Sequence, residues 1–254
     1  MPLLDVHALN KSFGGLKALS EVSLSVRAGS IKAVIGPNGA GKTTLFNLIT
    51  GNIASDSGKV IFNGKSIHGL PPYKIASLGM SRTFQSIKMF SGMTALENVM
   101  LGQHTRSKAG FVAGMFSLPW TWKEEKQIRA RSVELLELLE IVEFADTDAT
   151  SLSFGQQRAV ELARALASDP SMLLLDEPAA GLNIYETAEL AQLITKIRDR
   201  GITILLVEHD MSLVMDISDE IVVLSFGQKI AEDIPHNIQT NKEVIQIYLG
   251  DDDA

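Results

Sequence analysis

A glycine-rich run in the first fifth of the chain has the spacing of a loop that holds phosphate groups. It reads Gly-Pro-Asn-Gly-Ala-Gly-Lys-Thr-Thr and fits the pattern G-x-x-x-x-G-K-[ST]. Successive backbone N–H groups of such a loop form an anion-binding nest, and the following helix adds the positive end of its dipole. Lys42 is expected to reach the β- and γ-phosphates, and the Thr43 hydroxyl to bind Mg²⁺. The candidate nucleotide-binding residues here are Gly36, Pro37, Asn38, Gly39, Ala40, Gly41, Lys42, Thr43 and Thr44.

Two adjacent acidic residues follow an apolar run later in the chain. Residues 172–175 read as a buried strand, which ends at Asp176 and Glu177. This arrangement resembles the second metal-binding strand of P-loop ATPases, where the first carboxylate holds Mg²⁺ through water. Glu177 is then placed to polarise the attacking water. Two acids that merely cap a strand are the alternative, and the phosphate-binding loop upstream favours the metal site.

These residues need a scaffold, and the pattern of the chain predicts one. Residues 31–35 form a short apolar strand that enters the glycine loop, and residues 42–50 form the helix that the loop opens. Residues 3–9, 20–26 and 60–64 read as further strands. Beyond residue 168, strands 172–175, 202–207 and 220–224 alternate with helices 184–199 and 210–216, which predicts a parallel sheet.

The middle of the chain has a different character. Helical patterns dominate residues 72–144, including a leucine stripe within 124–142. We therefore predict an α/β fold: a P-loop NTPase core with a mostly parallel sheet, an N-terminal antiparallel β layer and a helical insert subdomain. Residues 1–254 form a single domain, with the core at about 1–87 and 166–254 and the helical subdomain at about 88–165.

Composition narrows the class of protein. The 254 residues, 45% hydrophobic and 21% charged, fit one packed domain, with or without an insert. A net charge of −7 argues against a nucleic-acid-binding face. The lack of cysteine excludes disulfides and thiolate metal sites and suits a reducing cytoplasm. We expect no signal peptide and no membrane span, so another chain must bring the protein to any membrane.

A second motif links the glycine loop to one superfamily. Residues 152–156 read Leu-Ser-Phe-Gly-Gln, which is similar to the signature of the ATP-binding cassette ATPases. In that family the signature of one subunit donates hydrogen bonds to the γ-phosphate of ATP bound by the other. The resemblance implies this role for Ser153, Gly155 and Gln156, and a two-fold dimer that completes two sites. A serine that simply caps a helix is also compatible, but it leaves the pairing with the glycine loop unexplained.

Further family elements occur in order along the chain. Phe13 resembles the aromatic residue that stacks on adenine, although a core phenylalanine is the alternative. Gln85 resembles the glutamine that contacts Mg²⁺ and water and connects to the transport subunit, and His209 resembles the switch histidine at the γ-phosphate. The chain departs from the pattern at Asn183, where most of the superfamily has aspartate, which puts a role for a carboxylate there in doubt.

Residues 81–85, 93–99, 177–183, 247–250 and the extra segment 106–126 support a finer resemblance. They are similar to the longer ATPase subunit of branched-chain (hydrophobic) amino-acid importers. The resemblance implies ATP hydrolysis with Mg²⁺, a second ATPase chain (a copy or a shorter sister), two integral-membrane permease subunits and an extracytoplasmic substrate-binding protein. It places the chain peripherally, at the cytoplasmic face of the membrane.

The same motifs are also compatible with other functions. Related ATPases serve urea uptake or lipid export, and the ATPase itself touches no cargo. A non-transport member acting on ribosomes or DNA is disfavoured by the single cassette and the acidic balance. A small-molecule kinase leaves the signature, Gln85 and His209 unexplained.

Two apolar groups could serve either as core or as contact surface. Ile87, Met89, Phe90 and Met93 could form an adaptable groove for a coupling helix, but burial inside the insert is the favoured interpretation. The same choice applies to Trp120 and Trp122, for which buried packing is again favoured.

Overall fold

The computed structural model describes residues 2–83, 87–103 and 119–249. Contacts between Cα atoms divide the chain into two compact units. The first contains residues 1–82 and 171–254, and the second contains residues 83–170. The chain therefore leaves the first unit once, forms the second from a continuous segment, and returns.

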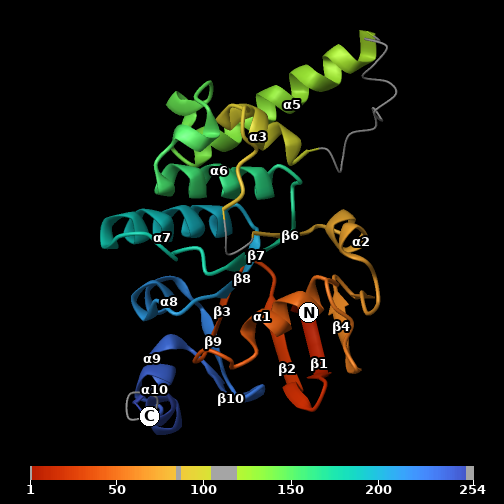
Figure 1. The fold of residues 1–254 in the computed structure, drawn as a ribbon, viewed down its shortest axis with the longest axis vertical. Coiled ribbons are helices and arrows are strands. Elements are labelled where there is room, and N and C mark those ends of the chain that lie inside the picture. The colour runs from red at the N-terminus through yellow and green to blue at the C-terminus, as the bar shows by residue number, and fades with distance from the viewer. Residues whose placement is uncertain (1, 84–86, 104–118, 250–254) are drawn as a thin grey trace. The chain divides into compact units, whose positions relative to one another are not determined.

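An antiparallel sheet begins the first unit. It contains β1 (Pro2–Phe13), β2 (Leu16–Arg27), β4 (Ser57–Phe62) and β5 (Lys65–Ser66), in the order β2-β1-β4-β5. Figure 1 shows β1 and β2 as the long pair at the N-terminal end of the colour scale. Both strands run well past the predicted ranges 3–9 and 20–26 because the tight turn at Gly14 continues the pairing to Phe13 and Leu16.

The second sheet of this unit is parallel except at one edge. Its strands are β3 (Ile31–Ile35), β6 (Met80–Arg82), β7 (Met172–Asp176), β8 (Thr203–Val207), β9 (Glu220–Ser225) and β10 (Gln228–Asp233), in the order β10-β9-β3-β8-β7-β6. Every residue of β3, β7 and β8 is buried. These strands are mostly apolar, apart from Lys32, Asp176 and Thr203, because both faces of a parallel sheet are covered.

Helix α1 (Lys42–Ile49) joins the two sheets into one core. Its buried residues Leu45, Phe46 and Ile49 pack in the same hydrophobic cluster as side chains of β1, β2 and β4 and of β3, β7, β8 and β9. The other helices of this unit are α2 (Pro72–Ser77), α7 (Ile184–Asp199), α8 (Met211–Ile217), α9 (Pro235–Thr240) and α10 (Lys242–Leu249). Lys42 thus begins a helix, Glu177 directly follows β7, and His209 comes two residues after the end of β8, in a unit that a single core holds together.

The second unit is helical in its described part, as predicted. It contains α3 (Ala95–Leu101), α5 (Pro119–Leu138), α6 (Phe154–Leu166) and two short 3₁₀ turns, Val142–Phe144 and Ala149–Ser151. Leucines 135, 136 and 139 of the predicted stripe are buried. None of the helices in the described ranges is long and apolar enough to cross a membrane.

The end of one predicted helix needs correction, and two strands of the parallel-rich sheet were not predicted. The helix expected to reach residue 142 ends at Leu138, because Glu140 takes a left-handed conformation (φ 60°) and Ile141 N–H bonds back to Leu136 O. This pairing is the Schellman pattern of helix ends. Strands β6 and β10 were not predicted, because β6 is short and β10 is rich in charged residues; they lie at the two edges of the sheet.

Candidate nucleotide-binding site

The glycine loop joins β3 to α1, as the sequence predicts. Two of its glycines are required by close packing as well as by backbone conformation. A Cβ atom on Gly36 (φ 150°) would lie 2.1 Å from Leu224 O, and one on Gly41 (φ 100°) would lie 2.7 Å from Ala18 O. The loop is therefore pressed against β9 and β2, which fixes the path of its backbone N–H groups.

A cavity of about 440 Å³ opens beside this loop. Loop residues 38–44 line it, together with three apolar side chains, Phe13, Leu16 and Phe226, and with Glu177. The Phe13 ring is 48% exposed, so it is not the core residue that the alternative interpretation required. The cavity has the size and mixed lining of a small-molecule site.

Lys42 is nearly buried at the base of the loop, with 8% of its surface exposed. Its Nζ donates hydrogen bonds to Gly36 O and, at 3.0 Å, to Pro37 O. Burial lowers the pKa of Lys42 from its ordinary 10.5, while the nearby charges of Glu177 and Asp176 act in the opposite direction. The three predicted charged residues are therefore close enough to interact electrostatically.

Asp176, at the end of β7, is 5% exposed and paired with a residue that sequence reasoning did not single out. Its Oδ2 accepts a hydrogen bond from Arg82 Nη2 at 2.7 Å. The other guanidinium nitrogen, Nη1, donates to Asn47 Oδ1 at 2.8 Å and to Thr50 Oγ1 at 3.1 Å, both next to or within α1. Arg82 thus connects the metal-binding candidate to the helix that follows the glycine loop.

Glu177 adopts a left-handed backbone conformation with φ 47°. That conformation is uncommon for residues other than glycine and recurs at functional sites. The Glu177 N–H donates to Val207 O at 2.9 Å, which fixes the turn against β8. The side chain is half-buried and lines the cavity, as a residue that acts on bound nucleotide must.

His209 follows the neighbouring strand β8 but does not line the cavity. Its side chain is 63% exposed, and its Nδ1 lies 3.7 Å from Glu208 Oε2. Strand register places it near the acidic pair in space, since Asp176 at the end of β7 pairs with Val207 at the end of β8. His209 thus lies at the same edge of the sheet as Asp176 and Glu177, with an exposed side chain.

Glu208 is a fully buried acid to which the sequence analysis assigned no role. Its Oε1 accepts from Ala179 N–H at 2.8 Å, and its Oε2 accepts from the N–H groups of His209 at 2.8 Å and Asp210 at 3.1 Å. One carboxylate therefore ties the loop after Glu177 to the loop that carries His209. The sequence signal that could have identified Glu208 is its position directly after an apolar strand, the same position that Asp176 and Glu177 have after residues 172–175.

Tyr248, on the C-terminal helix α10, is a second residue that was missed. Burial raises the pKa of Tyr248 to about 12, and the backbone of Gly36 acts on the hydroxyl in the opposite direction. The Tyr248 hydroxyl is buried near the Gly36 backbone, and among the described residues it has no hydrogen-bond partner. Nothing in the spacing of the two segments in sequence indicates this proximity.

The signature residues lie in the second unit, at the start of α6. Ser153 is its N-cap: Ser153 Oγ accepts from Gln156 N–H at 3.3 Å, and Gln156 Oε1 accepts from Ser153 N–H at 2.9 Å. Ser153 is exposed and Gly155 half-buried, and the first turn carries no acidic residue. This helix end can attract an anion from outside the unit.

The remaining residues singled out in the sequence either lie outside the described part of the structure or differ from their expected burial or role. Gln85 lies outside the described residues, as do the side chains of Trp120 and Trp122. None of Ile87, Met89, Phe90 and Met93 is buried, so the favoured interpretation of these four as core was wrong. Asn183 caps α7: its Oδ1 accepts from the N–H groups of Tyr185 at 2.9 Å and Glu186 at 3.1 Å.

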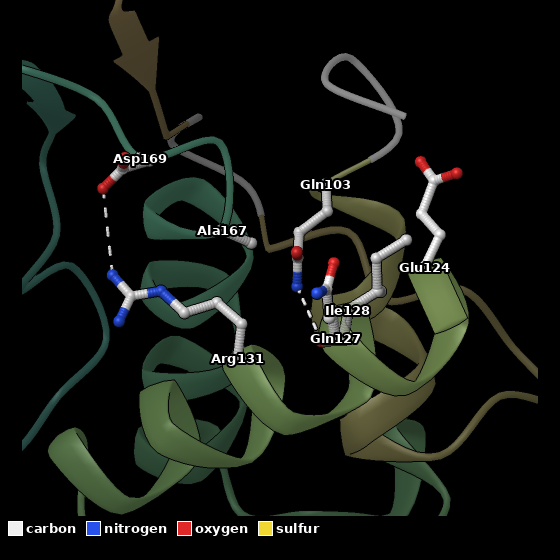
Figure 2. Close-up of a pocket in the computed structure, with 7 residues that line it drawn as sticks. All are labelled: Gln103, Glu124, Gln127, Ile128, Arg131, Ala167 and Asp169. Carbon is white, nitrogen blue, oxygen red and sulfur yellow. Dashed lines mark hydrogen bonds and ion pairs between the residues drawn. The ribbon is translucent and has the colours of Figure 1, made fainter. Parts of the chain in front are cut away.

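The helical unit contains a cavity of its own, of about 330 Å³. Figure 2 shows Arg131 on α5 facing Asp169, with Nη2 and Oδ1 3.8 Å apart, and Gln103 beside Ile128, whose carbonyl accepts from Gln103 Nε2 at 2.9 Å. None of the predicted site residues lines this cavity.

Comparisons with known proteins agree with these observations. The family model described as "ABC transporter" matches residues 19–180. The chain is 45% identical over 251 residues to the "High-affinity branched-chain amino acid transport ATP-binding protein BraF" of Pseudomonas aeruginosa, covering 98% of both chains. It is 42% identical to the LivG protein of the same description from Escherichia coli, again covering 98% of each.

Solved structures give the same fold. The crystal structure of the ADP conformation of an ATP-binding cassette of an ABC transporter has a TM-score of 0.87 at 35% identity, covering 98% of this chain and 99% of that one. A dimeric structure of a bacterial ABC transporter cassette has a TM-score of 0.76 at 26% identity, covering 91% and 98%. The predicted fold class is confirmed.

Proposed function

The chain belongs to the ABC transporter family and is an ATP-binding cassette ATPase, and from this premise we propose that it drives an importer of branched-chain or other hydrophobic amino acids. The observation that carries the proposal is similarity over nearly the whole chain to two ATP-binding proteins of branched-chain amino acid transport. The match extends through the second unit, which in our proposal meets the transport subunits.

ATP occupies the cavity beside the glycine loop, with its phosphates on the loop N–H groups and Lys42. The Thr43 hydroxyl and, through water, Asp176 would hold Mg²⁺, which would neutralise negative charge on the phosphates. Within the described residues no cluster of three or more His, Cys, Asp or Glu side chains could hold a metal alone. This fits Mg²⁺, which commonly takes one or two protein ligands and completes its shell with phosphate oxygens and water.

Hydrolysis needs a polarised water and a stabilised γ-phosphate. Glu177 polarises the water, since its carboxylate lines the cavity. His209 contacts the γ-phosphate, which requires its exposed ring to turn toward the cavity, and Gln85 contacts Mg²⁺ and the water. Positioning and electrostatics supply most of the rate enhancement, as in other phosphoryl transfers.

A second ATPase chain completes each site. Ser153, Gly155 and Gln156 of one chain approach the γ-phosphate held by the other, because the exposed start of α6 presents the positive end of the helix dipole. Closure and reopening of this dimer switch two permease subunits between their two forms. An extracytoplasmic binding protein supplies the amino acid, and the ATPase works at the cytoplasmic face of the membrane.

Affinity purification of the tagged chain from native membranes in mild detergent tests this proposal. We expect two multi-span permeases to accompany it, with either a second copy or a shorter sister ATPase. A co-encoded binding protein that binds leucine, isoleucine or valine in calorimetry would support the cargo. Permeases without such a binding protein would contradict the cargo alone, whereas ribosomal or DNA-repair partners would contradict transport.

A further inference from the structure

Phe226 is a large apolar side chain that the fold leaves almost fully exposed. It lies in the turn between β9 and β10, and 87% of its surface is accessible. It lines the same cavity as Phe13 and loop residues 38–44. Its backbone is left-handed, with φ 45°, which is a genuine outlier for a bulky side chain.

The turn that carries Phe226 is fixed to the nucleotide-binding elements. Gly227 N–H donates to Ala40 O at 3.1 Å, inside the glycine loop, and Gly227 O accepts from Ser20 N–H at 2.8 Å, on β2. A Cβ atom on Gly227 would lie 2.6 Å from Ala18 O, so the turn packs directly on β2. Phe226 therefore keeps its place beside the loop before any ligand arrives.

We propose that Phe226 is a second aromatic wall of the nucleotide site, which contacts the nucleobase together with Phe13. The cavity lining combines Lys42 and the loop residues, which suit phosphates, with three apolar side chains, Phe13, Leu16 and Phe226. Phe13 and Leu16 pair across the β1–β2 turn and are 48% and 72% exposed, so they present apolar surface to solvent. A nucleobase is the part of a nucleotide that such a surface accepts.

Backbone strain supports the same role. Left-handed φ values at bulky residues persist where the surroundings over-determine them, and they cluster at ligand sites. An asparagine would adopt this turn with less strain. Phenylalanine at position 226 is therefore unfavourable for the backbone of the turn but favourable for contact with an aromatic ligand.

The test compares two probes that share phosphates but differ in the base. Calorimetry would measure the dissociation constants of Mg·ATP and Mg·tripolyphosphate for the wild-type chain and for Phe226→Asn. We expect the variant to bind ATP roughly five- to tenfold more weakly, within the range of base–aromatic stacking, and tripolyphosphate unchanged. The separate variant Phe226→Trp should bind ATP about as tightly as wild type, because it keeps an aromatic face at this position.

Thermal unfolding of the nucleotide-free protein separates binding from folding. Phe226→Asn should unfold at the same or a higher temperature than wild type, because it relieves the left-handed strain. Tyr73→Ala is the matched control: it removes an aromatic that is 68% exposed on α2 and does not line the cavity, so both affinities should stay unchanged. The proposal is overturned if Phe226→Asn leaves ATP affinity unchanged or weakens both probes equally.

This inference rests on nucleotide binding at the glycine loop and not on the identity of the cargo. A wild-type chain that binds ATP no more tightly than tripolyphosphate would overturn the base contact while leaving the phosphate site intact. Purification with unexpected partners would leave the result of the binding test unaffected.

Discussion

Lys42 combines two demands that conflict in the nucleotide-free chain. Its amine must be charged to bind phosphate, yet the loop buries it against carbonyl oxygens. Burial lowers its pKa, so the charge is costly until phosphates arrive. The sequence predicted the contact with phosphate, but it could not predict this burial, which depends on how the loop packs on β2 and β9.

The pH dependence of this residue follows from the sign of that shift. Between the lowered pKa of folded Lys42 and the ordinary 10.5, the unfolded chain binds more protons, so the contribution of Lys42 to stability rises with pH. We expect Lys42→Met to be more stable than wild type near neutral pH, with the difference shrinking as pH rises toward 10.5. Urea unfolding with and without the substitution measures it, with exposed Lys74→Met as control; a difference independent of pH would contradict the prediction.

Arg82 shows what spacing alone does not reveal. Its side chain joins Asp176 to Asn47 and Thr50, so one guanidinium links β7 to α1. The sequence analysis assigned Asp176 to the metal and gave Arg82 no role, because β6 was not recognised as a strand of the sheet. Only the pairing of β6 with β7 brings the two residues together.

Removing Arg82 should leave a buried carboxylate without its main cation. Both side chains are less than a tenth exposed, at 8% and 7%, so Arg82→Ala should lower the free energy of unfolding by about 3–5 kcal/mol. The double variant Arg82→Ala with Asp176→Asn should lose less than the sum of the single changes. Chemical denaturation of the four proteins measures the coupling, and simple additivity would show that the pair contributes nothing.

At the scale of elements, the strands and helices that carry the motifs were predicted well. Strands β3, β7 and β8 are short, largely apolar runs, and helices α1 and α7 have an apolar face. The bounds of all five differ from the expected ones by no more than one residue at each end. The edge strand β10 was not predicted because its sequence does not alternate between apolar and polar residues and four of its six residues are polar. An edge strand lacks the burial that produces a readable pattern.

Glu208 connects two of these elements at their ends. Its carboxylate accepts three backbone hydrogen bonds, one from the loop after Glu177 and two from the loop of His209. Glu208→Gln replaces one acceptor oxygen by a donor, so at least one buried N–H loses its partner, at a cost of about 1–3 kcal/mol. We expect ATP hydrolysis to fall more than ATP affinity, since Lys42 and the glycine loop are untouched.

Steady-state kinetics and calorimetry on the same preparation measure that separation. Glu208→Asp is the informative companion, because it keeps the charge but shortens the reach to Ala179. Equal losses of affinity and turnover in both variants would mean that Glu208 supports the whole fold and does not act through the two loops.

At the scale of the whole molecule, the predicted site is distributed over two units. The phosphate loop, Asp176 and Glu177 belong to the first unit, and Ser153, Gly155 and Gln156 belong to the second. The sequence indicated this separation only through its resemblance to a family, since no spacing shows that a motif serves a neighbouring chain. The local fold of α6 is consistent with that use because its N-terminus is exposed and capped by Ser153.

Trapping ATP before hydrolysis should therefore change the oligomeric state. Glu177→Gln keeps the shape of the side chain but cannot accept a proton, so we expect turnover to fall at least about 100-fold while Mg·ATP still binds. Light scattering after gel filtration should then show twice the chain mass of 27.5 kDa with Mg·ATP and the single mass without it. Adding Gly155→Asp should abolish the dimer, because a carboxylate at the start of α6 repels the γ-phosphate. If the Glu177→Gln chain binds ATP but stays monomeric, the proposal that two copies of this chain form the dimer is contradicted. The same measurement with a sister ATPase added would then decide whether that chain supplies the second half of the site.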